Sequence, residues 1–176
     1  MELNDIDLVT LAKAAPHSAA FEALVRRHQA PLRAFLLRLT GDAPLADDLA
    51  QEALLKAYRG LDAFRGGASF RSWLFAIAMR EAAQARRKSA AQRRNDAAPA
   101  EGRTEPQEFA LDLQRALAAL GPEERTAVLL CDAAGFSHAE AAAAMAAPLG
   151  SVKTYVARAR EKLRAALLLE TSSACA

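Results

Sequence analysis

Apolar residues recur every three or four positions along most of this chain, which is the spacing of amphipathic α-helices. The longest stripe predicts a helix from about Ser18 to Thr40 and consists of Phe21, Leu24, Val25, Leu32, Phe35, Leu36 and Leu39. A shorter helix is expected over Asp5–Ala14, ended by Pro16. The pattern therefore predicts an all-α fold.

Capping residues mark the boundaries of two further helices in the first half. Gly41 and Asp42 separate the long helix from a third one, expected from about Pro44 to Leu61. Ser69 can cap a fourth helix, which leaves the core as the basic run Arg86-Arg87-Lys88. These signals place the predicted helices in one small domain, residues 1–88.

A linker is predicted over residues 89–107. It contains Pro99, Gly102 and Pro106, many small residues and no aromatic residue. Apolar stripes resume beyond it with Phe109, Leu111, Leu113 and Leu117, and then with Val128, Leu129 and Leu130. We therefore expect a second helical domain over 108–170, followed by a tail over 171–176.

The stretch 136–160 is typical of a helix-turn-helix. Ser137 and Glu140 have the spacing of a capping box, Pro148 should stop the first helix, and Gly150 is permissive beside the turn. The second helix presents Ser151, Lys153, Thr154, Tyr155, Arg158 and Lys162, as a helix that enters a DNA groove does. This stretch alone leaves open an alanine-rich hairpin with a solvated basic face.

The distribution of charge strengthens the nucleic-acid interpretation, although the net charge of the 176 residues is only +2. Six Lys or Arg stand against one Glu from Arg80 to Arg94, and five against one from Lys153 to Arg164. Two basic patches separated by an acidic connector predict two surfaces that meet phosphate. No apolar run is long enough to span a bilayer, and the acidic N-terminus is unlike a signal peptide, so a cytoplasmic location is expected.

The third predicted helix carries an acidic face opposite its apolar one. This face consists of Asp47, Asp48, Gln51, Glu52 and Leu55, which align at spacings of three and four. Acids beside an exposed Leu suit docking of a basic protein helix. A solvated face is the alternative, and a metal site at Asp48 and Glu52 is disfavoured because no further ligand repeats the spacing.

The loop before the fourth helix mixes aromatic residues with arginines. Phe64, Phe70 and Trp73 stand close to Arg65 and Arg71. Aromatic rings stack unpaired bases while arginines hold phosphates, so the loop suits single-stranded nucleic acid. Phe70 and Trp73 are expected to belong to the core instead.

Enzymatic chemistry finds no support in the sequence. No nucleophile-base pair, phosphate loop or metal cluster is recognisable, and the two cysteines lack zinc-ligand spacing. His17, His28 and His138 are scattered and are expected to be surface or capping residues, while Cys131 is expected to be a small buried hydrophobe. We expect no cofactor, no metal and no small-molecule substrate.

Four motifs together resemble a bacterial sigma factor of the extracytoplasmic-function (ECF) group, in the sigma-70 family. They are Asp47–Tyr58 with Phe64-Arg65-Gly66, then Ser69–Leu74, Leu120–Arg125 with Gly135-Phe136-Ser137, and Pro148–Thr154 with Arg158-Ala159-Arg160. The resemblance covers residues from about Ile6 to Leu168, and the order of the motifs makes it specific. It implies that the protein binds core RNA polymerase and directs promoter-specific transcription initiation. The alternative is a stand-alone helix-turn-helix regulator, which would not need the polymerase as a partner.

The resemblance also implies three sets of site residues. The set for the polymerase β′ clamp helices is Asp47, Asp48, Gln51, Glu52, Leu55 and Tyr58. The set for opening the −10 promoter element is Phe64, Arg65, Ser69, Arg71, Arg80, Gln84, Arg86, Arg87 and Lys88. The set for reading the −35 element is Ser137, Ser151, Lys153, Thr154, Tyr155, Arg158, Arg160 and Lys162, with the β flap touching the same domain. An anti-sigma factor that holds the protein inactive, in some cases at the inner membrane, is a further implied partner.

The sequence departs from the family pattern at a few of these positions. Many relatives have Asn and Asp where this chain has Arg80 and Gln84, and a Gly where Ala146 stands. A basic residue is frequent at the position of Tyr155. Preference for promoter sequence is therefore the property that the resemblance predicts least.

Overall fold

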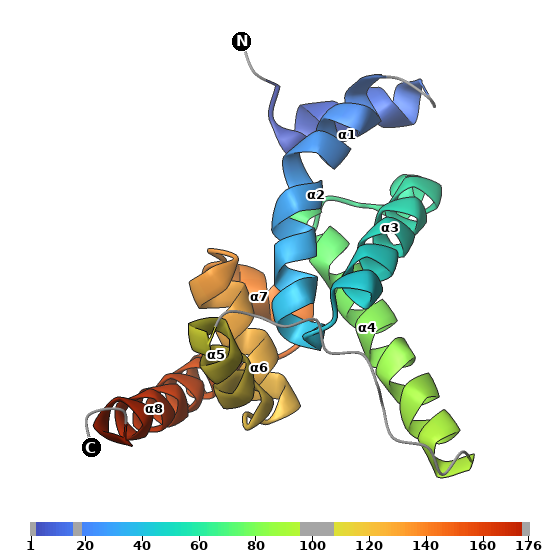
Figure 1. Ribbon diagram of the computed structural model, residues 1–176. Helices are drawn as coiled ribbons and strands as arrows, with labels where there is room; N and C mark the ends of the chain where they lie inside the picture. The colour runs from blue at the N-terminus through green and yellow to red at the C-terminus, as the bar shows by residue number, and fades with distance from the viewer. Residues whose placement is uncertain (1–2, 16–18, 96–107, 174–176) are drawn as a thin grey trace. The chain divides into compact units, whose positions relative to one another are not determined.

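The computed structural model describes residues 3–15, 19–95 and 108–173, and every regular element within these ranges is helical (Figure 1). The chain divides after Gly102 into two compact units. The predicted all-α fold with two helical units is confirmed. No helix in the described ranges is long and apolar enough to cross a membrane.

The first unit contains α1 (Asp5–Ala14), α2 (Ala19–Thr40), α3 (Ala43–Arg59), the short 3₁₀ helix η1 (Leu61–Ala63) and α4 (Phe70–Asn95). Helix α3 packs against both α2 and α4, as Figure 1 shows. The predicted cap at Asp42 is present, because its carboxylate accepts the N–H of Leu45 at 2.9 Å. Helix α4 runs seven residues past Lys88, so residues 89–95, which we expected to belong to the linker, are helical. Residues 96–107 lie outside the described ranges.

The core of the first unit consists of large side chains. Its fully buried members are Leu24, Leu32, Phe35, Leu36, Phe70, Leu74 and Phe75. Each side chain of this size contributes about 1.5–3 kcal/mol when it is removed from water. The predicted stripe of α2 supplies four of them, which explains why this long helix lies at the centre of the unit.

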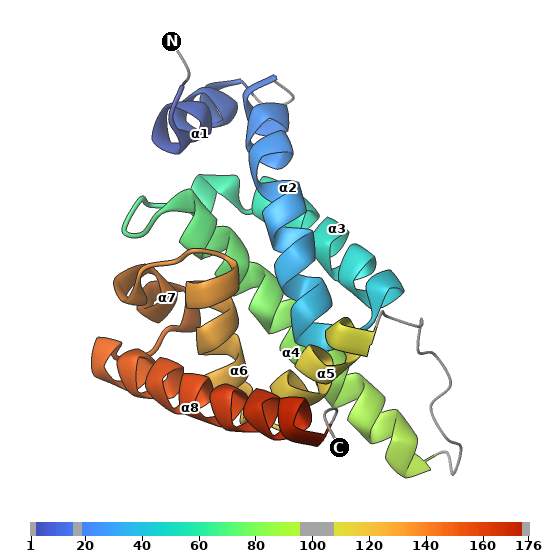
Figure 2. The same cartoon turned by 60° about the vertical axis from the view of Figure 1, so that its left-hand side comes forward.

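The second unit contains α5 (Glu108–Ala118), α6 (Pro122–Val128), the π-helical turn η2 (Leu129–Ala133), α7 (His138–Met145) and α8 (Leu149–Ser173). Helix α8 packs along α5, α6 and α7 (Figure 2). The fully buried large side chains here are only Leu130, Val152 and Val156, and alanines fill much of the remaining interior. The predicted buried face Val128–Leu130 is confirmed.

The turn between α7 and α8 differs from the prediction in one respect. Helix α7 ends at Met145, before Pro148 as expected, but Ala146 takes the left-handed conformation with φ 51° and ψ 41°. Gly150 lies inside α8 and has no role in the turn. A left-handed alanine is strained because its Cβ crowds the backbone.

Candidate functional site

The acidic face of α3 borders a groove between α3 and α4. The groove has a volume of about 570 Å³, and its lining includes Asp48, Gln51, Glu52, Leu55, Gln84 and Lys88. Asp48 and Gln51 are exposed, and Leu55 leaves 41% of its surface in contact with solvent. The predicted docking face thus combines a free carboxylate, an amide and an apolar side chain.

Two acids of the predicted docking face are already paired within the protein. Arg33 on α2 binds both carboxylate oxygens of Asp47, and this hydrogen bonding raises the pKa of Arg33. Lys56 lies 3.4 Å from Glu52 and 2.6 Å from Glu81 on α4, and the hydrogen bond to Glu81 is the main cause of the raised pKa of Lys56. Asp47 therefore helps to join α2 and α3, and Glu52 pairs with Lys56 of its own helix, while Asp48 makes no ion pair with any described residue.

Tyr58 occupies the end of the same helix. Its ring is half-buried and meets Phe21 of α2 edge-on, with centroids 4.9 Å apart. This packing makes Tyr58 a support for the α2–α3 pair more than an open contact residue.

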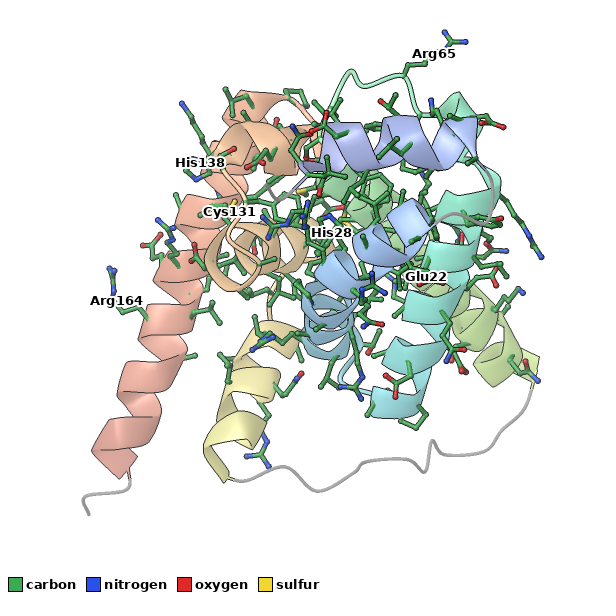
Figure 3. All side chains as sticks on the ribbon, turned by 90° about the horizontal axis from the view of Figure 1, so that it is seen from above. Glu22, His28, Arg65, Cys131, His138 and Arg164 are labelled. Atoms are coloured by element: carbon green, nitrogen blue, oxygen red, sulfur yellow. The ribbon has the colours of Figure 1, made fainter. Side chains whose placement is uncertain are left out.

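The loop of residues 64–69, called the 64–69 loop below, is anchored by aromatic rings at both ends. Phe64 is 8% exposed, and its ring contacts Phe70 and Trp73 at centroid distances of 6.0 and 5.2 Å. We expected Phe64 to be available for base stacking, but it belongs to the core, since hydrophobic contacts with the first turn of α4 bury it. Arg65 instead extends away from the ribbon (Figure 3).

Ser69 and Arg71 act at the start of α4. The hydroxyl of Ser69 accepts the N–H of Ser72 at 3.1 Å and donates to its Oγ at 2.9 Å, which confirms the predicted cap. The guanidinium of Arg71 lies 5.9 Å from the centre of the Phe75 ring, in cation–π range. Both residues of the predicted −10 set therefore also serve the fold.

The outer part of α4, from Arg80 to Lys88, carries most of the cations predicted to meet the −10 element. Arg80, Arg86 and Arg87 are exposed and form no ion pair within the described ranges. Gln84 and Lys88, one helical turn apart, line the groove beside α3. The structure thus separates these two residues from the other members of the predicted −10 set, because they lie next to the acidic docking face.

Helix α1 contributes side chains that the sequence did not indicate. Lys13 Nζ donates to the carbonyl oxygen of Phe64 at 2.6 Å, across 51 residues of sequence. His28 Nε2 lies 2.8 Å from Asp5 Oδ2, and desolvation is the main cause of the lowered pKa of this histidine. We expected His28 to be a surface or capping residue, but it is only 5% exposed and lies among the helices (Figure 3).

The second unit uses two of its predicted DNA contacts as internal ion pairs. Arg160 binds Asp132 of η2 through two hydrogen bonds of 2.6 and 2.9 Å. Lys162 binds Glu124 of α6 at 2.7 Å. The assignment of Arg160 and Lys162 as free DNA contacts is therefore weakened, since each holds α8 against a neighbouring element.

Glu124 is the carboxylate that this packing buries most. One oxygen accepts both the Lys162 ammonium and, at 3.3 Å, the N–H of Gly121 at the start of α6. The hydrogen bond from Lys162 is the main cause of the lowered pKa of Glu124. The carboxylate is thus held ionised where α6 and α8 meet.

The other predicted −35 residues lie at the free surface of α8 or near its start. Lys153, Thr154 and Arg158 are exposed, while Ser151 and Tyr155 are half-buried. The capping box at Ser137 is confirmed, because its hydroxyl accepts the N–H of Glu140 and its own N–H binds the Glu140 carboxylate. Lys153 and Arg158 keep their cationic heads without an ion-pair partner among the described residues.

Metal and thiol chemistry find little support in the described part of the chain. No group of three or more His, Cys, Asp or Glu residues there could hold a metal ion. Cys131, which we expected to be a small buried hydrophobe, is half-buried, and burial is the main cause of its raised pKa. Cys175 and His17 lie outside the described residues.

Each of the two units matches a known protein family. Residues 24–92 match the family described as Sigma-70 region 2, and residues 110–163 match Sigma-70, region 4. The chain is 37% identical to the ECF RNA polymerase sigma factor EcfG of Rhodopseudomonas palustris over 79% of its length and 80% of that protein. It is also 37% identical to the ECF sigma factor SigM of Mycobacterium tuberculosis, over 92% of its length and 84% of that protein.

Two solved structures share the fold. The sigma factor RpoE of Bartonella quintana, in complex with the anti-sigma factor NepR, aligns with a TM-score of 0.76 and 29% identity over 85% of this chain and 98% of its own. CnrH, in complex with the cytosolic domain of CnrY, aligns with a TM-score of 0.72 and 26% identity over 95% and 97%.

Proposed function

Because the chain belongs to the ECF sigma factors of the sigma-70 family, it directs promoter-specific transcription initiation by RNA polymerase, and we propose that three of its surfaces divide this work. The observation that carries the division is that exposed charged side chains without an ion-pair partner among the described residues lie on three surfaces. These are the acidic α3 face, the outer part of α4 with the 64–69 loop, and the exposed face of α8.

The acidic face docks core polymerase at the β′ clamp helices. Asp48 supplies the free carboxylate, and Gln51 and Leu55 supply hydrogen bonding and apolar contact. Gln84 and Lys88 border the same groove, so we assign them to the edge of this interface and not to the centre of the −10 contact.

The 64–69 loop and the outer part of α4 engage the −10 element. Arg65, Arg80, Arg86 and Arg87 are exposed cations, suited to phosphate contacts along a strand. Flipping a base out of the duplex costs a few kcal/mol, which contacts made by the loop must offset. The two ends of the loop are held by Phe64, Ser69 and Arg71, which affect the −10 contact by fixing where the loop lies.

The exposed face of α8 engages the −35 element. Lys153 and Arg158 are the candidates for base or phosphate contact, with Thr154 between them and Ser151 and Tyr155 at the margin. Arg160 and Lys162 orient α8 and make at most secondary contacts, because their charges are paired. Ser137 belongs to the same interface only as the cap of α7.

Three broader proposals accompany this assignment. The protein acts through binding surfaces and leaves the chemistry of RNA synthesis to the polymerase, without a cofactor or small-molecule substrate of its own. Its work with polymerase places it in the cytoplasm. Solved relatives bound to the anti-sigma factor NepR and to the cytosolic domain of CnrY suggest that an anti-sigma factor also restrains this chain.

Run-off transcription tests the proposal. Purified chain and core polymerase are incubated with genomic fragments, and the transcript starts are sequenced. We expect start sites preceded by shared −10 and −35 elements, and no specific duplex binding without core. Specific promoter binding by the chain alone would favour a stand-alone regulator, a reading that the family membership does not support.

A further inference from the structure

Helix α1 lies against the base of the 64–69 loop. It contacts η1, which precedes the loop, and α4, which follows it. In Figure 3 the ribbon of α1 lies beside the loop that carries Arg65. Helix α1 also lies outside residues 24–92, the part of the first unit that matches Sigma-70 region 2.

At the entry of the loop, Lys13 binds two backbone carbonyls. Its ammonium lies 2.6 Å from the carbonyl oxygen of Phe64 and 3.4 Å from that of Asp62. Carbonyls at the end of a short helix lack the N–H partners that continuation of the helix would provide. Lys13 therefore fixes where the chain leaves η1 and enters the loop.

At the exit of the loop, a chain of contacts reaches from the half-buried Asp5 of α1 to the first residue of α4. Asp5 lies 2.8 Å from His28 Nε2 and accepts a 2.6 Å hydrogen bond from Arg27. The His28 ring packs against Phe70 with centroids 5.4 Å apart. Asp5 thus holds the histidine on which Phe70 rests.

The tip of the loop has no comparable support. A methyl group added at Gly66 or Gly67 would meet no atom within 4 Å, so the tip is not packed against the unit. Gly66 also has a φ of +73°. The direction of the tip, and of Arg65 beside it, is therefore set by how the two ends are held.

We propose that α1 is a brace that positions the 64–69 loop for promoter melting, with Lys13 as a positioning residue at the loop entry and Asp5 at its exit. This inference rests on the proposed role of the loop at the −10 element. A flipped base gains its compensating contacts only if the loop is already in place, because ordering the loop at that moment would add to the cost.

The test measures open-complex formation by holoenzyme at a promoter found by run-off transcription. Lys13→Met removes the ammonium and keeps the aliphatic stem, and we expect it to slow melting by about 3- to 10-fold, the size of one ordinary net hydrogen bond. Core affinity should stay unchanged. On a template with a pre-opened −10 region the defect should shrink, and Lys13→Arg should restore part of the rate.

Arg26→Met is the matched control, since Arg26 is an exposed cation whose ion pair, among the described residues, is with Glu22 on the same helix. Asp5→Asn, which weakens the exit contact, should give a milder defect of the same kind. Arg65→Ala tests the loop itself. If Arg65→Ala slows melting while Lys13→Met and Asp5→Asn match wild type, the brace is refuted and the loop's role stands.

Two other outcomes also decide the question. If Arg65→Ala and Lys13→Met both melt the promoter normally, the proposed role of the loop fails. Lys13→Met could also lower the affinity for core polymerase and slow open-complex formation equally on duplex and pre-opened templates. In that case Lys13 stabilises the whole unit, and the positioning role is refuted.

Discussion

In α4, the cations Arg80, Arg86 and Arg87 are exposed and form no ion pair within the described residues, whereas in α8 Arg160 and Lys162 bind Asp132 and Glu124. The difference follows from the two cores. The first unit has a core of three phenylalanines and four leucines, and the cations that join its helices are others, such as Lys56, which binds Glu81 of α4.

The second unit buries fewer large side chains and many alanines. Alanine lets helices approach closely but contributes little apolar area, and the ion pairs Arg160–Asp132 and Lys162–Glu124 add contacts between α8 and its neighbours. A basic helix can therefore be a DNA contact, a structural clamp, or both. The number of cations alone does not separate these roles, but their partners do.

The largest effect that this comparison predicts concerns Asp48, the exposed acid of the α3 face that makes no ion pair with a described residue. Asp48→Arg should weaken binding to core polymerase by about 100-fold or more, because it reverses a charge at the centre of the docking face. The fold should remain intact, since Asp48 is exposed and makes no ion pair with a described residue. Fluorescence anisotropy of labelled chain titrated with core measures the affinity.

Glu22→Arg is the control for this prediction, as Glu22 is an exposed acid on α2 that faces Arg26. It should bind core as wild type does. Equal affinity of Asp48→Arg and Glu22→Arg for core would remove Asp48 from the interface.

A matched pair of lysines in α8 sharpens the comparison most directly. Lys153→Met should weaken −35 recognition by about 1–3 kcal/mol if Lys153 contacts a base, and leave the thermal unfolding midpoint unchanged. Lys162→Met should lower that midpoint, because it leaves Glu124 without its partner. Transcription from promoters with intact or altered −35 elements and circular dichroism melting measure the two effects.

The opposite result would reverse the assignment. If Lys162→Met kept its stability and lost −35 recognition, the ion pair seen in the free chain would have to open on DNA. Lys162 would then be a contact residue after all.

The pH dependence of the second unit follows from the same ion pair. The pKa of Glu124 is lowered in the folded chain, so its carboxylate contributes stability that is present above its ordinary pKa, 4.5, and is lost as pH falls through the lowered value. Near neutral pH the unfolding temperature of wild type should be higher than that of Glu124→Gln. The difference between the two temperatures should disappear below about pH 4. A constant gap across this range would mean that ionisation of Glu124 is irrelevant.

Local features of this fold could be read from the sequence because they depend on neighbours along the chain. The caps at Asp42, Ser69 and Ser137 and the apolar stripe of α2 are of this kind. Each needs residues only three or four positions apart.

Contacts between distant segments could not be read in this way. Lys13 meets Phe64 across 51 residues, and nothing in either neighbourhood marks the pair. Which cations of α8 meet acids depends on how α6, η2 and α8 cross, and residue spacing does not specify that geometry. The candidate site was therefore predicted as surfaces, while the division into free and paired side chains required the structure.

The smallest predicted effect concerns the turn between α7 and α8, where many relatives have a Gly at the position of Ala146. Ala146 ends α7 with φ 51°, a conformation that glycine adopts without strain. Ala146→Gly should raise the free energy of unfolding by about 0.5–1 kcal/mol, since relief of the left-handed strain exceeds the added entropy of the unfolded chain. Ala143→Gly, at an exposed helical position of α7, should lower it by a similar amount. Urea unfolding of both variants measures the pair, and a loss of stability in Ala146→Gly would show that the strained turn is not a weak point of the alanine-rich unit.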